Sequence, residues 1–549
     1  MNESQPQSHQ LGTKYRALPI LIPILFFSPV LFAGLFWDDL ILAVENYDKG
    51  QALPTIWAEI VEWTRGWISK GRFFPISTAL SISIFHFNDF NNHWGYHVLQ
   101  LIAIPLSFIP FLRAFSLNLK ERIILALILC GCARFYPHYH DPYISYHIVI
   151  PVFCFFFFYS FILFDQYLKT GKIEKGIGAL ILYLLCLATY EIAYPLIAVF
   201  IIQLFTVTSK EKPRWGTWLL IVVLGVLMLA FQVWLRKQAQ NMSYVGIEAG
   251  FDPIKIIRTF VIQSFAPTPL ALHIGNGIRW LGDNNKGIPI ESLLAGGAFL
   301  LIIAFCGLIL WRYWKNRSRE NMVLLIALVI WLTPAVLMAM SGKYQTELRW
   351  GTGYIPRYLQ TFGIALLLLG LGKSFLTSKV GIVTLTTLVI TVFTLNVFTL
   401  REINRGFAGA RLLFNIVDDK EFLVDIDCHR LSLRDVYYDR LTLFDSLNAD
   451  LEIYEAEQPY DGDHTMLIYE GHPGSEWAIL GTYENNTLLN PHLLAGPELK
   501  LSIPPHEQMK PVREWKFFPL GAEKISYQDA VKSVSEGTPP LTPKLTASP

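Results

Sequence analysis

The sequence is poor in charge for its length. Only 16% of its 549 residues are Asp, Glu, Lys or Arg, whereas a soluble domain carries about 25%. Its net charge of +1 lacks the basic excess with which nucleic-acid-binding proteins hold phosphates. These shortages argue against an ordinary soluble domain and against a nucleic-acid-binding protein.

Cysteine is scarce too, and its positions exclude two of its usual roles. Five of the six cysteines lie in or beside apolar runs, where a thiol behaves as a small buried apolar group. Cys428 is the one cysteine of the polar C-terminal part, which therefore cannot form an internal disulfide. Cys130 and Cys132 have no second cysteine pair or nearby histidine at the spacing of a zinc site.

Long apolar runs are what the sequence has in abundance. Apolar residues make up 52% of the chain and aromatic residues 14%, which suits helices that face lipid. The first run follows Lys14 and Arg16 and exceeds the apolar core of a signal peptide, so we expect an uncleaved first helix. Eleven runs are predicted to span the membrane: residues 17–36, 94–112, 123–136, 148–168, 177–189, 192–205, 218–235, 290–310, 322–340, 358–371 and 380–400.

The Lys and Arg residues between these runs predict the orientation. They are more than twice as dense in one set of connections as in the other, and cytoplasmic loops are enriched in both residue types. Residues 1–16 are therefore predicted to be cytoplasmic, and residues 17–400 to form a membrane domain whose first outer loop covers 37–93. The chain after residue 400 is predicted to lie outside.

The stretch 177–205 predicts a turn inside the membrane. Its 29 residues would be about 43 Å long as one helix, which is too long for one span and too short for two complete ones. Basic segments flank it on both sides, so the chain must cross and return. We predict a turn near Tyr190 and Glu191, with Glu191 at the floor of a recessed polar pocket.

Two further segments complete the predicted architecture. Residues 254–274 are apolar but interrupted by charges and prolines, and are predicted to lie in the outer interface as a bent amphipathic segment. Short apolar runs separated by Gly, Pro, Asp and Asn predict a small β-rich domain over 401–532, and residues 533–549 a disordered tail. The predicted fold is an all-α polytopic membrane protein with this extracytoplasmic domain.

Polar residues with potential chemistry begin directly after the first span. Asp38 and Asp39, preceded by Trp37, stand at the outer boundary, where they are either a solvated helix end or a general base for a hydroxyl. The loop that follows carries Arg72 within Gly-Arg-Phe-Phe-Pro. A short apolar stretch, 76–87, then leads to Gly-Tyr-His, which ends at His97.

This order resembles the GT-C class of glycosyltransferases. The nearest likeness is to tetratricopeptide-bearing O-mannosyltransferases, and a looser one is to bacterial serotype-converting glucosyltransferases. The resemblance covers roughly residues 17–210, with weaker echoes to 371, and the chain lacks the tetratricopeptide tail. It implies a GT-C-like arrangement of helices and a sugar donor carried on polyprenyl phosphate.

The resemblance also implies roles for later residues. Glu191 resembles the family acid between the short fifth and sixth spans, which adds it to Asp38 and Asp39 as a catalytic residue. Tyr190 stands where the family usually has lysine. The predicted substrate cavity collects residues from the outer loops: Trp37, Arg72, His97, His138, His140, Asp141 and Tyr190.

The His138, His140 and Asp141 loop resembles a proline-containing, histidine-bearing loop of the same family. The alternative is an ordinary polar loop. Two histidines and an aspartate at this spacing could ligate a divalent metal, although nothing in the sequence fixes the geometry, and the resemblance does not imply a metal.

Basic residues near the late spans are predicted to bind the donor phosphate. Arg357 and Tyr358 begin one span, and Lys343 and Arg349 lie in the outer loop before it. A guanidinium fork matches phosphate oxygens, although pairing with Glu347 or with lipid headgroups is the alternative. A second outer cluster consists of Arg236, Lys237, Lys255 and Arg258.

The implied reaction is a direct displacement at the outer face of the membrane, expected to be the bacterial inner membrane. Asp38 or Asp39 would deprotonate the hydroxyl of a glycan, lipid or protein acceptor, and attack on the anomeric carbon would invert it. Rival functions are a flippase or transporter of lipid-linked sugar, a non-catalytic envelope-assembly protein, and a polysaccharide polymerase or ligase.

Overall fold

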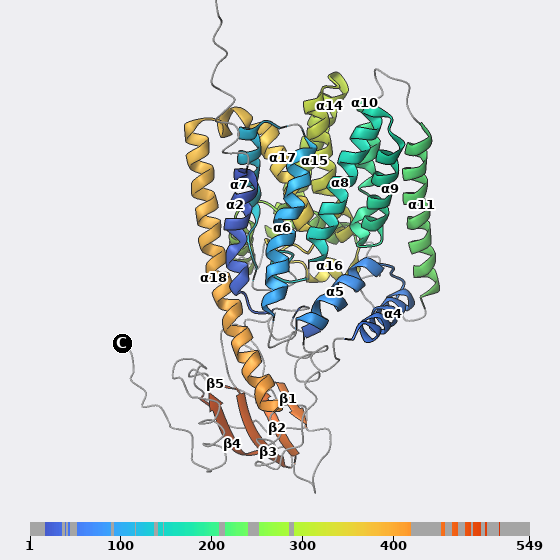
Figure 1. Ribbon diagram of the computed structural model, residues 1–549. Helices are drawn as coiled ribbons and strands as arrows, with labels where there is room; N and C mark the ends of the chain where they lie inside the picture. The colour runs from blue at the N-terminus through green and yellow to red at the C-terminus, as the bar shows by residue number, and fades with distance from the viewer. Residues whose placement is uncertain are drawn as a thin grey trace, which may run out of the picture. The chain divides into compact units, whose positions relative to one another are not determined.

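In a computed structural model, the described residues up to 418 are almost entirely helical, as the apolar runs predict (Figure 1). After that point only short strands are described. The structure describes residues 17–35, 39, 42–43, 52–88, 93–115, 117–136, 141–146, 148–207, 215–239, 252–284 and 290–418, and the strands given below.

Six described helices are long and apolar enough to cross a membrane, so the chain is an integral membrane protein. The last of them is the first part of a longer helix, where residues Lys379–Arg401 form the apolar stretch. These helices are α6 (Trp94–Ala114), α8 (Val149–Thr170), α14 (Ile290–Lys315), α15 (Arg319–Ala339), α17 (Arg357–Leu376) and α18 (Lys379–Asp418).

The predicted count of eleven spans is not supported. Most of the other predicted spans coincide with helices that are too short to cross about 30 Å of hydrocarbon at 1.5 Å per residue. These elements are α2 (Leu18–Phe27) with η1 (Ser28–Phe32), α7 (Leu119–Cys132), α9 (Ile173–Leu187) and α10 (Ile197–Val207). The predicted span 218–235 lies within α11 (Trp215–Gln238), part of whose side chains fall outside the described residues.

The predicted turn near Glu191 is confirmed. Helix α9 ends at Leu187, a single 3-10 turn, η2 (Glu191–Ala193), follows, and α10 begins at Ile197. The predicted bend in residues 254–274 is also present, because α12 (Pro253–Phe265) and α13 (Ala271–Asn284) meet at Leu270, whose φ is 57°. Three more helices lie in segments that the sequence predicts to connect spans: α4 (Leu53–Ser69), α5 (Pro75–Phe87) and α16 (Gly342–Glu347).

The core of the helical unit is aromatic. Helix α8 packs against α6 and α9, and α15 packs against α17; Figure 1 shows these helices side by side. Phe111 of α6, Phe158 of α8 and Phe362 of α17 meet with ring centroids 4.7–5.0 Å apart. Gly363 lets α17 approach α15 closely, since a Cβ there would lie 2.6 Å from the Ala327 carbonyl oxygen.

The chain divides into two compact units, and each is described by itself. The first consists of residues Met1–Leu31, Gly50–Phe87 and Trp94–Val397; the second of Phe32–Lys49, Asn88–His93 and Phe398–Pro549. In the second unit, Asn404 of α18 accepts a hydrogen bond from the Gly34 N–H and donates one to the Phe32 carbonyl, both 2.6 Å long. This amide therefore fixes the chain just after η1.

Strands occur in the C-terminal part, but the predicted domain over 401–532 is not established by them. Helix α18 continues to Asp418, beyond the predicted boundary at 400, and most of the later residues, including the predicted tail 533–549, lie outside the described ones. Strands β1 to β4 form an antiparallel sheet in chain order, and β5 pairs with β6. Their bounds are β1 Glu452–Glu455, β2 His464–Tyr469, β3 Ala478–Glu484, β4 Thr487–Ala495, β5 Lys500–Leu501 and β6 Trp515–Lys516.

Candidate functional site

The Gly-Arg-Phe-Phe-Pro segment is clamped between α9 and α11. Gly71 has a φ of +77°, and a Cβ at this position would lie 2.9 Å from the Cα of Arg236 on α11. The Phe73 carbonyl accepts a hydrogen bond from Gln232 of α11 at 3.0 Å, and the Ile76 N–H donates to the Ala188 carbonyl at 3.1 Å. Glycine is therefore required here both for its backbone conformation and for the close approach of α11.

This clamp aims Arg72 at Glu191. The two nitrogens of the guanidinium fork reach the two carboxylate oxygens, with Nε to Oε1 at 3.1 Å and Nη2 to Oε2 at 3.3 Å. Arg236 adds a second guanidinium, 3.3 Å from Glu191 Oε1. Two cations thus share one carboxylate, and we name Arg72, Glu191 and Arg236 the outer triad, after the side of the membrane on which the sequence predicts them.

Exposure in the outer triad rises from Arg72 outward. The side chains of Arg72, Glu191 and Arg236 are 11%, 21% and 41% exposed. The Arg72 guanidinium also lies 4.6 Å from the ring centre of Phe74 and 5.4 Å from that of Trp67, which restrains it further. The triad carries a net charge of +1, and its most exposed cation, Arg236, is accessible to an anion from solvent.

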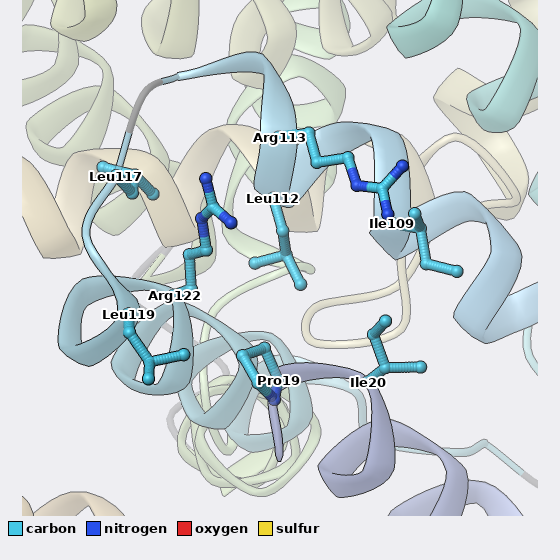
Figure 2. Close-up of a pocket in the computed structure, with 8 residues that line it drawn as sticks. All are labelled: Pro19, Ile20, Ile109, Leu112, Arg113, Leu117, Leu119 and Arg122. Atoms are coloured by element: carbon cyan, nitrogen blue, oxygen red, sulfur yellow. The ribbon is translucent and has the colours of Figure 1, made fainter. Parts of the chain in front are cut away.

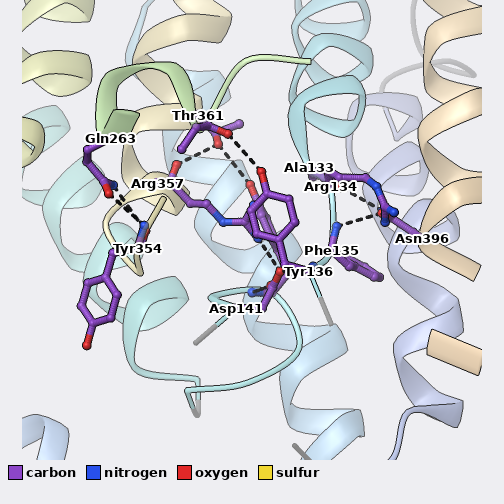
Figure 3. Close-up of polar contacts among 12 residues, drawn as sticks. Ala133, Arg134, Phe135, Tyr136, Asp141, Gln263, Tyr354, Arg357, Thr361 and Asn396 are labelled. Carbon is purple, nitrogen blue, oxygen red and sulfur yellow. Dashed lines mark hydrogen bonds and ion pairs between the residues drawn. The ribbon is translucent and has the colours of Figure 1, made fainter. Parts of the chain in front are cut away.

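A second charged pair is fully buried. Asp141 accepts hydrogen bonds from the backbone N–H groups of Tyr136 and Tyr143, both at 2.7 Å. The same carboxylate pairs with Arg357 at the start of α17, which is 2% exposed (Figure 3). The described residues on both sides of position 141 therefore hold one carboxylate, whose charge Arg357 balances.

Arg357 is held from several directions. Its guanidinium lies 3.5 Å from the ring centre of Tyr136, and its carbonyl accepts a hydrogen bond from Thr361 at 2.8 Å. Figure 3 shows the loop before α17 tied down by Gln263 of α12, which accepts from the Tyr354 N–H at 2.8 Å. With these contacts, Arg357 ties the start of α17 to Tyr136 and Asp141, which lie between α7 and α8, rather than standing open at a surface.

Asn396 of α18 closes the other side of this network. Its amide oxygen accepts from the Phe135 N–H at 2.8 Å and from Arg134 at 3.0 Å, and its amide nitrogen donates to the Ala133 carbonyl at 2.8 Å (Figure 3). These bonds satisfy backbone groups just after the end of α7, where a helix leaves its carbonyls without partners.

The buried pair and the outer triad are linked by two tyrosines. The ring of Tyr146, in the loop that contains Asp141, lies edge-on to the ring of Tyr190, with centroids 6.1 Å apart. Tyr190 directly precedes Glu191 and is 5% exposed. Predicted site residues from four separated segments, represented by Arg72, Asp141, Glu191 and Arg357, thus form one connected region of the helical unit.

Of the other predicted residues that the structure describes in the helical unit, two are buried and two lie at least partly at the surface. Tyr358 is buried and its hydroxyl pairs with that of Ser107 at 2.8 Å, and His97 is buried with its Nδ1 3.2 Å from Gln100. Arg349 is exposed. Lys343 pairs with Glu347, one of the alternatives that the sequence left open, at 3.8 Å.

The carboxylates after the first span remain a prediction. Trp37 and Asp38 lie outside the described residues, as do His138 and His140. Asp39 is buried and belongs to the second unit. Among the described residues, no group of three or more His, Cys, Asp and Glu side chains could hold a metal ion.

Sequence reasoning missed a buried pair between α4 and α5. Glu59 of α4 and His86 of α5 lie 2.5 Å apart and both are buried, so they fasten α4 onto α5. The sequence did carry a signal for this pair, because Glu59 is a charged residue on the same face of α4 as the buried Ile56. Of the second basic cluster, Arg236 joins the outer triad, whereas Arg258 pairs with Glu291 at 3.2 Å and Lys255 with Asp252 at 3.8 Å.

Comparisons with models of known protein families, with curated proteins and with solved structures gave no match.

Changing Gly71 to Ala should disrupt the outer triad. The added methyl would meet the α11 backbone, and a positive φ is unfavourable for alanine, so we expect a loss of about 1–3 kcal/mol. Gly66→Ala is the matched control, because this glycine lies within α4 and a Cβ there meets nothing within 4 Å. It should raise stability by up to about 1 kcal/mol.

Unfolding midpoints of the two detergent-solubilised variants, compared with that of the unchanged protein, check this prediction. Equal midpoints for Gly71→Ala and Gly66→Ala would contradict the close packing of Gly71 against α11.

Proposed function

We propose that this protein is a GT-C-like glycosyltransferase that moves a sugar from a polyprenyl-phosphate donor to an acceptor hydroxyl at the outer face of the membrane. The observation that carries the proposal is the bidentate contact between Arg72 and Glu191. It joins the Gly-Arg-Phe-Phe-Pro motif to the acid between two short helices, two features that the family resemblance assigns to one site.

The outer triad supports binding of an anionic donor. Arg236 directs one nitrogen at Glu191, and a guanidinium has five N–H donors in a planar fork. With its side chain 41% exposed, it can offer further donors to a phosphate oxygen. Arg349 and Lys343 are the remaining proposed phosphate ligands, whereas the buried contacts of Arg357 and Tyr358 suit them to shaping the site.

Glu191 is better suited to stabilising charge than to accepting a proton. Two guanidinium groups within 3.3 Å favour its ionised form, and a carboxylate stabilised in this way is a weak base. We assign it the role of fixing both arginines and stabilising positive charge on the sugar as the donor bond breaks.

The base is assigned to Asp38 or Asp39. A carboxylate takes the proton of the acceptor hydroxyl, whose oxygen forms a bond to the anomeric carbon. The bond from that carbon to the phosphate oxygen breaks, and its electron pair leaves with the polyprenyl phosphate, whose charge the arginines stabilise. A single displacement of this kind inverts the anomeric centre.

The finer architecture belongs to the same proposal. It includes eleven membrane crossings, in which the short helices complete the membrane domain, and a β-rich extracytoplasmic domain after α18. The N-terminus is proposed to lie in the cytoplasm of a bacterial cell, with the protein in the inner membrane.

Replacing Asp38 or Asp39 with Asn tests the assigned base. At least one single variant should lose transfer by about 10²- to 10⁴-fold, the usual effect of removing a general base, while unfolding at the same temperature as the unchanged protein. The assay follows release of polyprenyl phosphate from a labelled polyprenyl-phosphate sugar, with a membrane extract of the host cells as the acceptor source. Full activity in both variants would refute the assignment.

A further inference from the structure

A cavity of about 530 Å³ lies where the start of α2, the end of α6 and the start of α7 meet (Figure 2). Six of its lining side chains are apolar and two are arginines, and none of the lining residues is acidic. Figure 2 shows the arginines reaching the cavity from either side of Leu112. The lining residues are Pro19, Ile20, Ile109, Leu112, Arg113, Leu117, Leu119 and Arg122.

The carboxylate next to Arg122 in the chain is already engaged elsewhere. Glu121 pairs with Lys373 at 2.7 Å and accepts a hydrogen bond from the Asn118 N–H at 3.0 Å. Burial acts to raise the pKa of this carboxyl, but Lys373 and the Asn118 N–H outweigh it and lower the pKa below its ordinary value. Glu121 therefore stays charged and completes the capping box of α7 with Asn118, rather than pairing with the cavity's arginines.

Arg122 also has an unmet hydrogen-bonding need. Its Nε is buried and has no hydrogen-bond partner among the described residues. A buried donor of a charged group is expected to find an acceptor. The side chains that line the cavity offer no acceptor, since they are apolar apart from the two arginines, so a molecule that enters the cavity can supply one.

We propose that this cavity binds the phosphate headgroup of an anionic two-chain phospholipid. Arg113 and Arg122 provide guanidinium donors for the phosphate oxygens, and the six apolar side chains provide a surface for the first part of the acyl chains. The Lys and Arg distribution predicts that this end of α6 and α7 faces the cytoplasm, where the leaflet is rich in anionic lipids.

The combination of residues favours a lipid over a free anion. Inorganic phosphate would need the two arginines but would gain nothing from six apolar walls, whereas a phospholipid uses both. The site belongs to the end of the helices predicted to be cytoplasmic and shares no residue with the outer triad. The inference therefore does not rest on the proposed transfer reaction.

Titration of the full-length protein in a neutral detergent tests this site. The probe is dioctanoyl phosphatidylglycerol, the reference is dioctanoyl phosphatidylcholine with the same chains, and the readout is the shift of the thermal unfolding midpoint. We expect the anionic lipid to bind about tenfold or more tightly than the zwitterionic one, the effect of one or two charge-assisted hydrogen bonds. Equal binding of the two lipids would overturn recognition of the headgroup.

Variants identify the cavity as the place of binding. R113Q/R122Q should reduce the affinity for phosphatidylglycerol to that for phosphatidylcholine. R317Q is the matched control, because Arg317 is an exposed cation between α14 and α15, predicted to face the same side, and does not line the cavity. If the double variant does not fold, R113Q decides, since its side chain is exposed.

Three results would overturn the proposal. The first is unchanged affinity for phosphatidylglycerol in R113Q/R122Q, or in R113Q where that variant decides. The second is an equal loss in R317Q, which would indicate a general surface charge effect. The third is complete displacement of phosphatidylglycerol by millimolar inorganic phosphate, which would mark a site for free anions.

Discussion

Replacing Asp141 with Asn should be among the most destabilising single changes in the described helical unit. The substitution leaves Arg357, which is 2% exposed, as a buried charge without its counter-ion. Removing one partner of a buried ion pair costs about 3–5 kcal/mol. Unfolding of the purified variant in mixed micelles measures the loss.

A double variant separates the charge from the packing. Asp141→Asn combined with Arg357→Met removes both charges and should recover part of the stability, because no uncompensated charge remains. Arg349→Gln is the control at an exposed arginine near the same end of α17, and we expect a change within about 0.5 kcal/mol. An Asp141→Asn variant as stable as that control would contradict the structural role of the pair.

Replacing Glu191 with Gln should have the largest effect on the proposed reaction. The change keeps the shape of the side chain but removes the negative charge that holds Arg72 and Arg236 together. The two guanidinium groups would then repel each other, and stabilisation of positive charge on the sugar would be lost. We expect transfer to fall by about 10²- to 10³-fold, the usual effect of removing one preorganised electrostatic contact.

Two further variants refine this test. Arg72→Lys keeps the charge but cannot make the bidentate contact, so it should lose most of the activity as well. Glu62→Gln removes an exposed carboxylate of α4 outside the outer triad and should leave the transfer rate unchanged. Full activity of Glu191→Gln would remove this residue from the site.

The positions of the helices could be predicted because they depend on local composition. The turn at Glu191 followed from the length of one apolar stretch and from the basic residues at both its ends. The span predicted over 380–400 matches the apolar part of α18, but hydropathy records only where an apolar surface ends and not where a helix ends. A helix can continue without an apolar surface, and this one runs to Asp418.

The partners of the polar residues could be predicted only in part. The resemblance grouped Arg72 with Glu191, and the structure brings them into contact. The pairing of Asp141 with Arg357 joins residues 216 positions apart and depends on how α7, α8 and α17 pack. Residue types alone leave Arg357 equally suited to a phosphate or a carboxylate, so only packing could decide which anion it meets.

The most direct test of the proposed function is a mass spectrum of the lipid that co-purifies with the protein. We predict a polyprenyl-phosphate sugar bound to the unchanged protein and lost from R72Q/R236Q. It should be retained by R258Q, whose arginine pairs with Glu291 outside the outer triad. Bulk phospholipid alone in the unchanged protein, or equal retention of the polyprenyl-phosphate sugar by R72Q/R236Q, would contradict a donor site at the outer triad.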